Sequence, residues 1–160
     1  MRLEDWRLDE EYGWRSGTVR WARLGDGPPV VLCHGTPWSS FVWRDLAVYL
    51  SADHSVYVWD MIGYGKSDKP DADVSLGAQS DLFAALLEHW DLDAPHVLAH
   101  DFGGAVALRS HLLDHRNFRS LALVDVVAVR PWGSPFFRLV GEHPDVVGRL
   151  PEALHRAVVR

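Results

Sequence analysis

One short segment of this 160-residue sequence places a carboxylate where it could act as a nucleophile. An apolar stretch beginning at Val97 runs into a small-x-Asp-x-small pattern, in which Ala99 and Gly103 stand two positions either side of Asp101. A turn of this kind forces its central residue into a strained backbone conformation, so the flanking residues must be small. A helix beginning at Gly103 adds positive potential beneath the carboxylate. We therefore predict that Asp101 is a nucleophile presented at the carboxyl edge of a sheet.

A second segment, His34-Gly-Thr-Pro-Trp38, follows an earlier apolar run. An oxyanion hole needs two main-chain N–H groups that converge on one oxygen, and we predict that the amides of Thr36 and Phe102 supply them. His34 is expected to orient its loop and not to transfer protons. Trp38 is a candidate for contact with a substrate.

The elements that must position these residues follow from the spacing of apolar side chains. Turn residues alternate with aromatic and β-branched residues over 5–24, which predicts an antiparallel hairpin. Short apolar runs then alternate with amphipathic segments, a pattern typical of a parallel sheet with crossover helices. The predicted strands are Val30–Cys33, Ser55–Trp59, Val97–Ala99 and Ser120–Val124. The predicted helices are Ser39–Leu50, Ser80–Trp90 and Gly103–His115.

The pattern changes after Arg130, where prolines divide the sequence into short, helical pieces. We expect residues 1–130 to form the N-terminal part of an α/β core, and residues 131–160 to form the start of a helical lid. The sheet is then expected to end after about six strands with an unpaired edge, as in a fragment of a longer enzyme.

The composition excludes several classes of function. A formal net charge of -6, without a run of lysines or arginines, gives no footprint for nucleic acid or an anionic membrane surface. No apolar run is long enough to span a bilayer, and the N-terminus lacks the apolar region of a signal peptide. The single cysteine, Cys33, fits a reducing compartment. We expect a cytoplasmic protein that binds a small apolar substrate and water, whereas the sequence does not predict its oligomeric state.

Two segments come close to known cofactor or metal motifs, but each lacks a residue that the motif requires. The segment Gly63–Ser67 ends like a phosphate-binding loop, but Asp60 occupies the position where that loop needs its first glycine. His111 and His115 lie one helical turn apart, yet Leu112 stands where the metalloprotease signature requires a glutamate. We therefore expect neither a cofactor nor a metal site.

Three motifs in the same order give the chain a family resemblance. His34-Gly-x-Pro, the loop Gly63-Tyr-Gly-Lys-Ser-Asp-Lys-Pro70 and His100-Asp-Phe-Gly-Gly104 resemble those of the α/β-hydrolase superfamily, and of its branch of haloalkane dehalogenases and epoxide hydrolases. The resemblance spans about residues 18–130 and implies an α/β-hydrolase fold, a mostly parallel sheet with flanking helices. Gly35, Gly103 and Gly104 are its structural glycines. Asp125 resembles the acid of one dehalogenase subgroup, but an aspartate also stands there in relatives that do not use it.

An aspartate nucleophile predicts a reaction at saturated carbon. Carboxylates are ionised at neutral pH, and attack on a carbon bearing halide or epoxide oxygen gives an ester, whereas attack on an acyl carbon gives a reactive anhydride. A histidine then activates water against that ester. In the resembling enzymes this histidine comes late in the chain, so we expect it beyond Arg160 and no turnover by these residues alone.

The leaving group is left open by the sequence. Thr36 and Phe102 occupy positions where dehalogenases of the resembling type carry asparagine and tryptophan donors, and phenylalanine has no donor. Epoxide hydrolases use lid tyrosines, and no tyrosine follows Tyr64. The Thr36-Pro-Trp-Ser-Ser context favours dehalogenation slightly. The alternatives are a carboxylic-ester or other acyl hydrolase of the same fold, and a truncated product without catalysis.

Overall fold

The computed structural model describes residues 2–15, 17–129 and 132–158. Two compact units are present, Met1–Val126 and Val127–Arg160, and each is described by itself. The first unit contains the sheet and all of the predicted site residues. The division lies a few residues before the boundary at 130 that the sequence suggested.

The first unit is built on a six-stranded sheet in the order β1-β2-β4-β3-β5-β6. The predicted hairpin forms from adjacent antiparallel strands, and β2 continues antiparallel onto β4, while β3, β4, β5 and β6 are mutually parallel. All four predicted core strands are confirmed to within a residue at either end. The strands are β1 (Glu10–Trp14), β2 (Gly17–Leu24), β3 (Pro29–Cys33), β4 (Ser55–Trp59), β5 (His96–His100) and β6 (Ser120–Val124).

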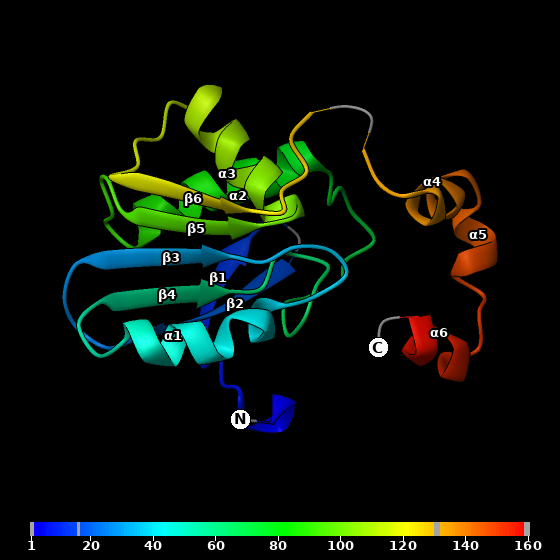
Figure 1. The fold of residues 1–160 in the computed structure, drawn as a ribbon, viewed down its shortest axis with the longest axis horizontal. Helices are drawn as coiled ribbons and strands as arrows, with labels where there is room; N and C mark the ends of the chain where they lie inside the picture. Colours follow the sequence, from blue (N-terminus) through cyan, green and yellow to red (C-terminus); the bar gives the residue numbers. More distant parts are fainter. Residues whose placement is uncertain (1, 16, 130–131, 159–160) are drawn as a thin grey trace. The chain divides into compact units, whose positions relative to one another are not determined.

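The central strands are buried on both faces because their apolar runs are continuous. Side chains alternate across the sheet, so successive residues of β3 and β4 enter two different cores. One core contains Val31 and Trp59 and is covered by α2 and α3, and the other contains Leu32 and Val58 and is covered by α1. Figure 1 shows α1 on one side of the sheet and α2 and α3 on the other. The helices are α1 (Arg44–Leu50), preceded by a 3-10 turn at Ser40–Trp43, α2 (Leu76–His89) and α3 (Phe102–Leu112).

Two predicted helix boundaries are wrong. Helix α2 begins at Leu76 and not at Ser80, because Ser75 caps it by accepting a hydrogen bond from the Ala78 amide at 3.4 Å. Helix α3 ends at Leu112 and not at His115, whose φ of 54° is incompatible with continuation of a right-handed helix. A side-chain cap sets the first boundary and a backbone conformation the second, and neither is visible in the apolar period.

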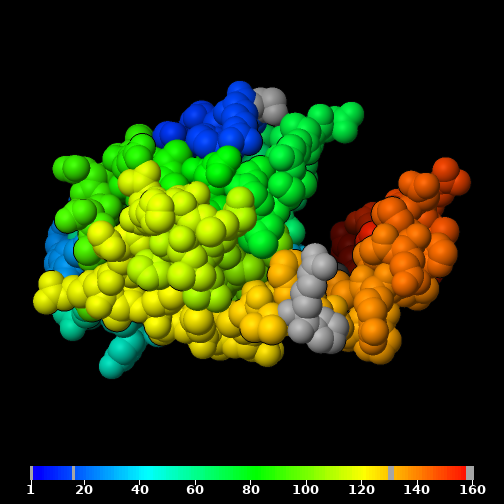
Figure 2. Space-filling model, turned by 90° about the horizontal axis from the view of Figure 1, so that it is seen from above, coloured from blue at the N-terminus to red at the C-terminus, as the bar shows by residue number. Residues whose placement is uncertain are grey.

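Strand β6 forms one of the two edges of the sheet and is exposed. It pairs with β5 alone among the described strands, and its Leu123 and Val124 are 40% and 49% exposed. In Figure 2 the segment from α3 to β6, coloured yellow-green to yellow, forms a continuous part of the surface. An edge strand with exposed apolar side chains is open to pairing with another strand.

The second unit is helical, as the proline spacing predicts. It contains α4 (Pro135–Glu142), α5 (Pro144–Val147) and α6 (Glu152–Val158). Proline occupies the start of α4 and of α5, where its missing N–H leaves no helical hydrogen bond unmade. Among the described residues, no helix is both long and apolar enough to cross a membrane.

Candidate active site

Asp101 lies in the sharp turn between β5 and α3. Its φ of 49° and ψ of -121° are strained for a residue with a side chain, and such a conformation costs about 1–3 kcal/mol unless its surroundings impose it. Two hydrogen bonds hold this turn: the Asp101 amide donates to the Val124 carbonyl at 3.2 Å, and the Gly104 amide donates to the Asp101 carbonyl at 3.0 Å. The turn therefore presents Asp101 at the carboxyl ends of β5 and β6, as the sequence predicted.

Glycines allow three close approaches around this turn. A Cβ atom on Gly35 would lie 2.4 Å from the Asp101 Cβ, and one on Gly103 would lie 2.3 Å from the His34 carbonyl oxygen. A Cβ atom on Gly104 would lie 2.2 Å from a methyl carbon of Val126. A side chain at any of these three glycines would therefore clash. Only glycine allows the loop after β3, the turn at Asp101 and the residues after β6 to pack this closely.

The Asp101 carboxylate is held asymmetrically. Its Oδ1 accepts a hydrogen bond from the Thr36 amide at 2.7 Å, so one of the two predicted oxyanion-hole amides reaches the carboxylate. No hydrogen bond joins the Phe102 amide to Asp101 in the described part of the chain. The other carboxylate oxygen, Oδ2, accepts no hydrogen bond from the described residues.

Thr36 also contacts Tyr64, a residue with no role predicted from sequence. Its Oγ1 lies 2.9 Å from the hydroxyl of Tyr64, which comes from the loop after β4. Because the backbone of Thr36 bonds Asp101 and its side chain bonds Tyr64, this residue links two loops at the site. The position of Tyr64 between the glycines of the Gly-Tyr-Gly motif is a signal that the turn matters, but the motif does not indicate which atom the phenol contacts.

His34 is structural, because both of its ring nitrogens are occupied. Nε2 accepts a hydrogen bond from the Met61 amide at 3.0 Å, so the proton is on Nδ1, which donates to the Gly35 carbonyl at 3.0 Å. Burial lowers the pKa of His34 and keeps the ring neutral. No nitrogen of His34 remains to accept a proton from water, and its role in orienting the loop stays a prediction.

Asp60 is a second residue whose importance the sequence did not reveal. It is buried, and its two carboxylate oxygens accept hydrogen bonds from the amides of Ser40 and Lys66, each at 2.7 Å. These amides belong to the loops after β3 and β4, so the carboxylate joins the loop of Thr36 to the loop of Tyr64. The Gly65 backbone passes so close that a Cβ atom there would lie 2.0 Å from Asp60 Oδ2.

The remaining predicted residues lie near the same sheet edge without direct bonds to Asp101. Asp125 follows β6, is exposed and has a φ of 46°, so its side chain leaves the strand at a sharp turn. Trp38 is 40% exposed on the loop after β3. Among the described histidines, none is hydrogen-bonded to the Asp101 carboxylate; the ring of His100 meets Trp43 edge-on, with 6.4 Å between ring centroids. The roles of Asp125 and Trp38 stay predictions.

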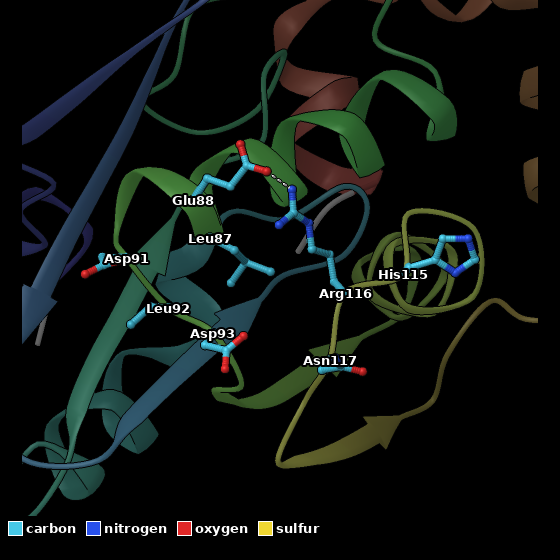
Figure 3. A pocket seen from close by; sticks show the side chains of 8 residues that line it. All are labelled: Leu87, Glu88, Asp91, Leu92, Asp93, His115, Arg116 and Asn117. Atoms are coloured by element: carbon cyan, nitrogen blue, oxygen red, sulfur yellow. Dashed lines mark hydrogen bonds and ion pairs between the residues drawn. The ribbon is translucent and has the colours of Figure 1, made fainter.

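A cavity of about 300 Å³ lies at the amino ends of β5 and β6 (Figure 3), whereas Asp101 lies at their carboxyl ends. It is lined by the end of α2 and by the segments that precede β5 and β6. The Arg116 guanidinium donates to the Glu88 carboxylate at its wall. The cavity therefore contributes nothing to the chemistry of Asp101. No cluster of metal-ligating side chains occurs among the described residues.

Comparison with known proteins gives a consistent result. The sequence profile of the alpha/beta hydrolase fold matches residues 28–149. A haloalkane dehalogenase of Mesorhizobium japonicum is 34% identical over 116 residues, which are 72% of this chain and 37% of that protein. A cis-3-alkyl-4-alkyloxetan-2-one decarboxylase of Xanthomonas campestris pv. campestris is 35% identical over 112 residues, which are 64% of this chain and 37% of that protein.

A crystal structure extends the comparison to almost the whole chain. An alpha/beta hydrolase fold protein from Burkholderia ambifaria is 49% identical, with a TM-score of 0.92 over 96% of this chain and 57% of that one. The matched parts are thus 37% of each of the two curated relatives and 57% of the crystallised protein.

Proposed function

The chain belongs to the α/β-hydrolase fold family, and from that premise we propose that it is the nucleophile-bearing part of a hydrolase that acts at a saturated carbon carrying a halide or an epoxide oxygen. The observation that carries the proposal is the Asp101 carboxylate in a strained turn, with Oδ1 held by the Thr36 amide and with no hydrogen bond to Oδ2 from the described residues. The relationship to a haloalkane dehalogenase supports the halide as the first leaving group to test.

The two oxygens of Asp101 take different parts in this reaction. Oδ2 attacks the saturated carbon and becomes the ester oxygen, while the leaving group departs with the bonding electrons. Oδ1 stays as the carbonyl oxygen of the ester. When water attacks that carbonyl carbon, negative charge develops on Oδ1, 2.7 Å from the Thr36 nitrogen. The Phe102 amide, at the start of α3, is the proposed second donor to this oxyanion.

The second half of the reaction needs a base. In the described part of the chain no histidine bonds Asp101, and His34 is occupied at both nitrogens. Asp125 at the end of β6 is the proposed partner of a histidine base. With the nucleophile present and no paired base among the described residues, we expect the alkyl ester to form and to accumulate.

A second candidate acts on strained lactones. The relative that is named as an oxetanone decarboxylase matches this chain at the same level of identity as the dehalogenase does. A four-membered lactone also offers a ring carbon to a carboxylate nucleophile, and its ring opening supplies the leaving group. Acyl hydrolysis of ordinary esters is less favoured, because attack by Asp101 on their carbonyl would give an anhydride.

The proposal is tested by the stoichiometry of halide release. The purified 160-residue chain is incubated with excess 1-chlorohexane, and chloride is measured over time. We expect a burst of about one chloride per chain and then almost none, because the ester blocks the nucleophile. The Asp101→Asn chain, which keeps the shape of the side chain, should show no burst.

Parallel incubations resolve the alternatives. A dialkyl oxetan-2-one and styrene oxide replace the chloroalkane, and adducts are detected by intact-protein mass. An adduct with the lactone alone would move the substrate class to lactones. Absence of halide release and of any adduct would contradict nucleophilic catalysis by this chain.

A further inference from the structure

The hydrogen bond between Tyr64 and Thr36 lies beside the nucleophile but has no part in the mechanism above. Thr36 holds Oδ1 of Asp101 through its amide at 2.7 Å, and its hydroxyl oxygen lies 2.9 Å from the Tyr64 hydroxyl. We propose that Tyr64 is a positioning residue, which turns the hydroxyl proton of Thr36 toward the halide that leaves when Asp101 attacks a haloalkane. This inference rests on the proposed function and assigns its leaving-group donor.

The direction of the hydrogen bond follows from the chemistry of the two hydroxyl groups. A phenol is the stronger acid and the better donor, whereas an aliphatic alcohol oxygen is the better acceptor. Tyr64 therefore donates and Thr36 accepts. Among the described residues Tyr64 is the only hydrogen-bond partner of Thr36 Oγ1, so the threonine proton stays available for a group outside this pair.

Tyr64 is fixed in place from both sides. Its neighbours Gly63 and Gly65 have φ of 89° and 49°, values that glycine adopts without strain, and they set the turn that carries the phenol. The Tyr64 ring meets His34 edge-on, with 5.5 Å between ring centroids. His34 is itself held by hydrogen bonds from Met61 and to Gly35, so it forms a rigid support. The hydroxyl pair is thus oriented before a substrate binds.

The leaving group needs such a donor because the side chain of Phe102 carries no N–H or O–H group. As Oδ2 of Asp101 forms the new carbon–oxygen bond, the carbon–halogen bond breaks and the halide keeps the electron pair; no proton is transferred. Negative charge on the halide appears only as the bond breaks, so a hydrogen bond to it is stronger in the transition state than in the substrate. The Thr36 hydroxyl is attached to the residue that already holds the carboxylate.

A double-mutant cycle tests this role. Halide-burst rates are measured for the 160-residue chain and for its Tyr64→Phe, Thr36→Val, Thr36→Ser and Tyr64→Phe/Thr36→Val variants, with 1-chlorohexane and 1-iodohexane. Tyr64→Phe keeps the ring that packs on His34 and removes only the hydroxyl. We expect it to slow chloride release about tenfold and iodide release by less than about twofold, because the smaller ion depends more on a hydrogen bond.

The other variants separate positioning from packing. Thr36→Val should show the same selective loss with chloride, and Thr36→Ser should recover most of the rate. In the Thr36→Val background, Tyr64→Phe should have no further effect, because its proton donor is already gone. The pair of Thr36 variants decides the outcome even if Tyr64→Phe fails to fold, since the chloride-to-iodide rate ratio must fall in Thr36→Val and not in Thr36→Ser.

Two failures have different meanings. If the unmodified chain releases no halide and carries no adduct, the proposed function fails and this inference fails with it. If the unmodified chain reacts, but Tyr64→Phe slows both halides equally or adds its full effect to Thr36→Val, Tyr64 only packs. The inference is then overturned, and the nucleophilic role of Asp101 stands.

Discussion

A single methyl group at Gly103 should separate Asp101 from its hydrogen-bond donor. The Cβ atom of alanine there would lie 2.3 Å from the His34 carbonyl oxygen and 2.6 Å from that of Cys33. Both atoms are backbone, so relief requires the start of α3 to withdraw from the loop after β3 by roughly 1 Å. The Asp101–Thr36 bond of 2.7 Å connects these two segments and would then be lost.

The size of the effect follows from this shift. Overpacking against backbone costs about 2–3 kcal/mol of unfolding free energy. A displacement of about 1 Å at a nucleophile slows its reaction by about 100-fold. Urea unfolding followed by tryptophan fluorescence measures the first quantity, and the halide burst measures the second.

Gly13→Ala is the matched control, because a Cβ atom at Gly13 meets nothing within 4 Å. It should change stability by less than about 0.5 kcal/mol and leave the burst rate unchanged. If Gly103→Ala proves as stable and as reactive as Gly13→Ala, the close packing described around Asp101 is refuted.

Three further predictions concern stability and association. Asp60→Asn should lower the unfolding free energy by about 3 kcal/mol, because the Ser40 and Lys66 amides donate to different carboxylate oxygens and the NH2 group that replaces one oxygen cannot accept a hydrogen bond. The exposed Asp26→Asn should cost almost nothing, and equal urea midpoints would contradict the role given to Asp60. Burial holds the pKa of His34 below the ordinary histidine value of about 6.5, so its contribution to stability is fully present above that pH and is lost as pH falls toward the folded pKa. As the pH is lowered from 6.5, the unfolding free energy from urea titrations should therefore decrease by up to about 1.4 kcal/mol per pH unit, and by less in His34→Gln. An unchanged slope in that variant would assign the effect to another group. Leu123→Lys on the exposed edge strand should reduce concentration-dependent self-association in sedimentation velocity while changing the unfolding free energy by less than about 1 kcal/mol. Identical sedimentation of the two chains would show that this edge strand does not mediate self-association.

The parts of the site that could be predicted from sequence are those encoded locally. Five consecutive residues specify the strained turn at Asp101. The His-Gly turn at the end of a strand predicts that the Thr36 amide lies beside it. The strands were found because their apolar runs are short, continuous and bounded by turn residues. The apolar period predicts a start for α2 that is four residues too late, because it does not reveal the capping Ser75.

The parts that were missed depend on contacts between loops. Asp60 bonds amides 20 residues before it and six after it, and the hydroxyls of Thr36 and Tyr64 meet across 28 residues of sequence. Side-chain periodicity carries no information about which loops meet at a sheet edge. Only the strand order, with β3 between β4 and β5, brings these loops around one carboxylate.

If Asp101 is the nucleophile, it forms a covalent ester with its substrate, and peptide-resolved mass spectrometry of the chain after reaction with 1-bromohexane locates that ester. Cys33 is the competing nucleophile to exclude, but it is buried, and burial raises the pKa of its thiol to about 12. We predict a hexyl group on Asp101, no hexyl group on Cys33, and no adduct in the Asp101→Asn chain. A hexyl group on another residue, or an Asp101→Asn chain modified as fast as the unmodified one, would show that Asp101 is not the nucleophile.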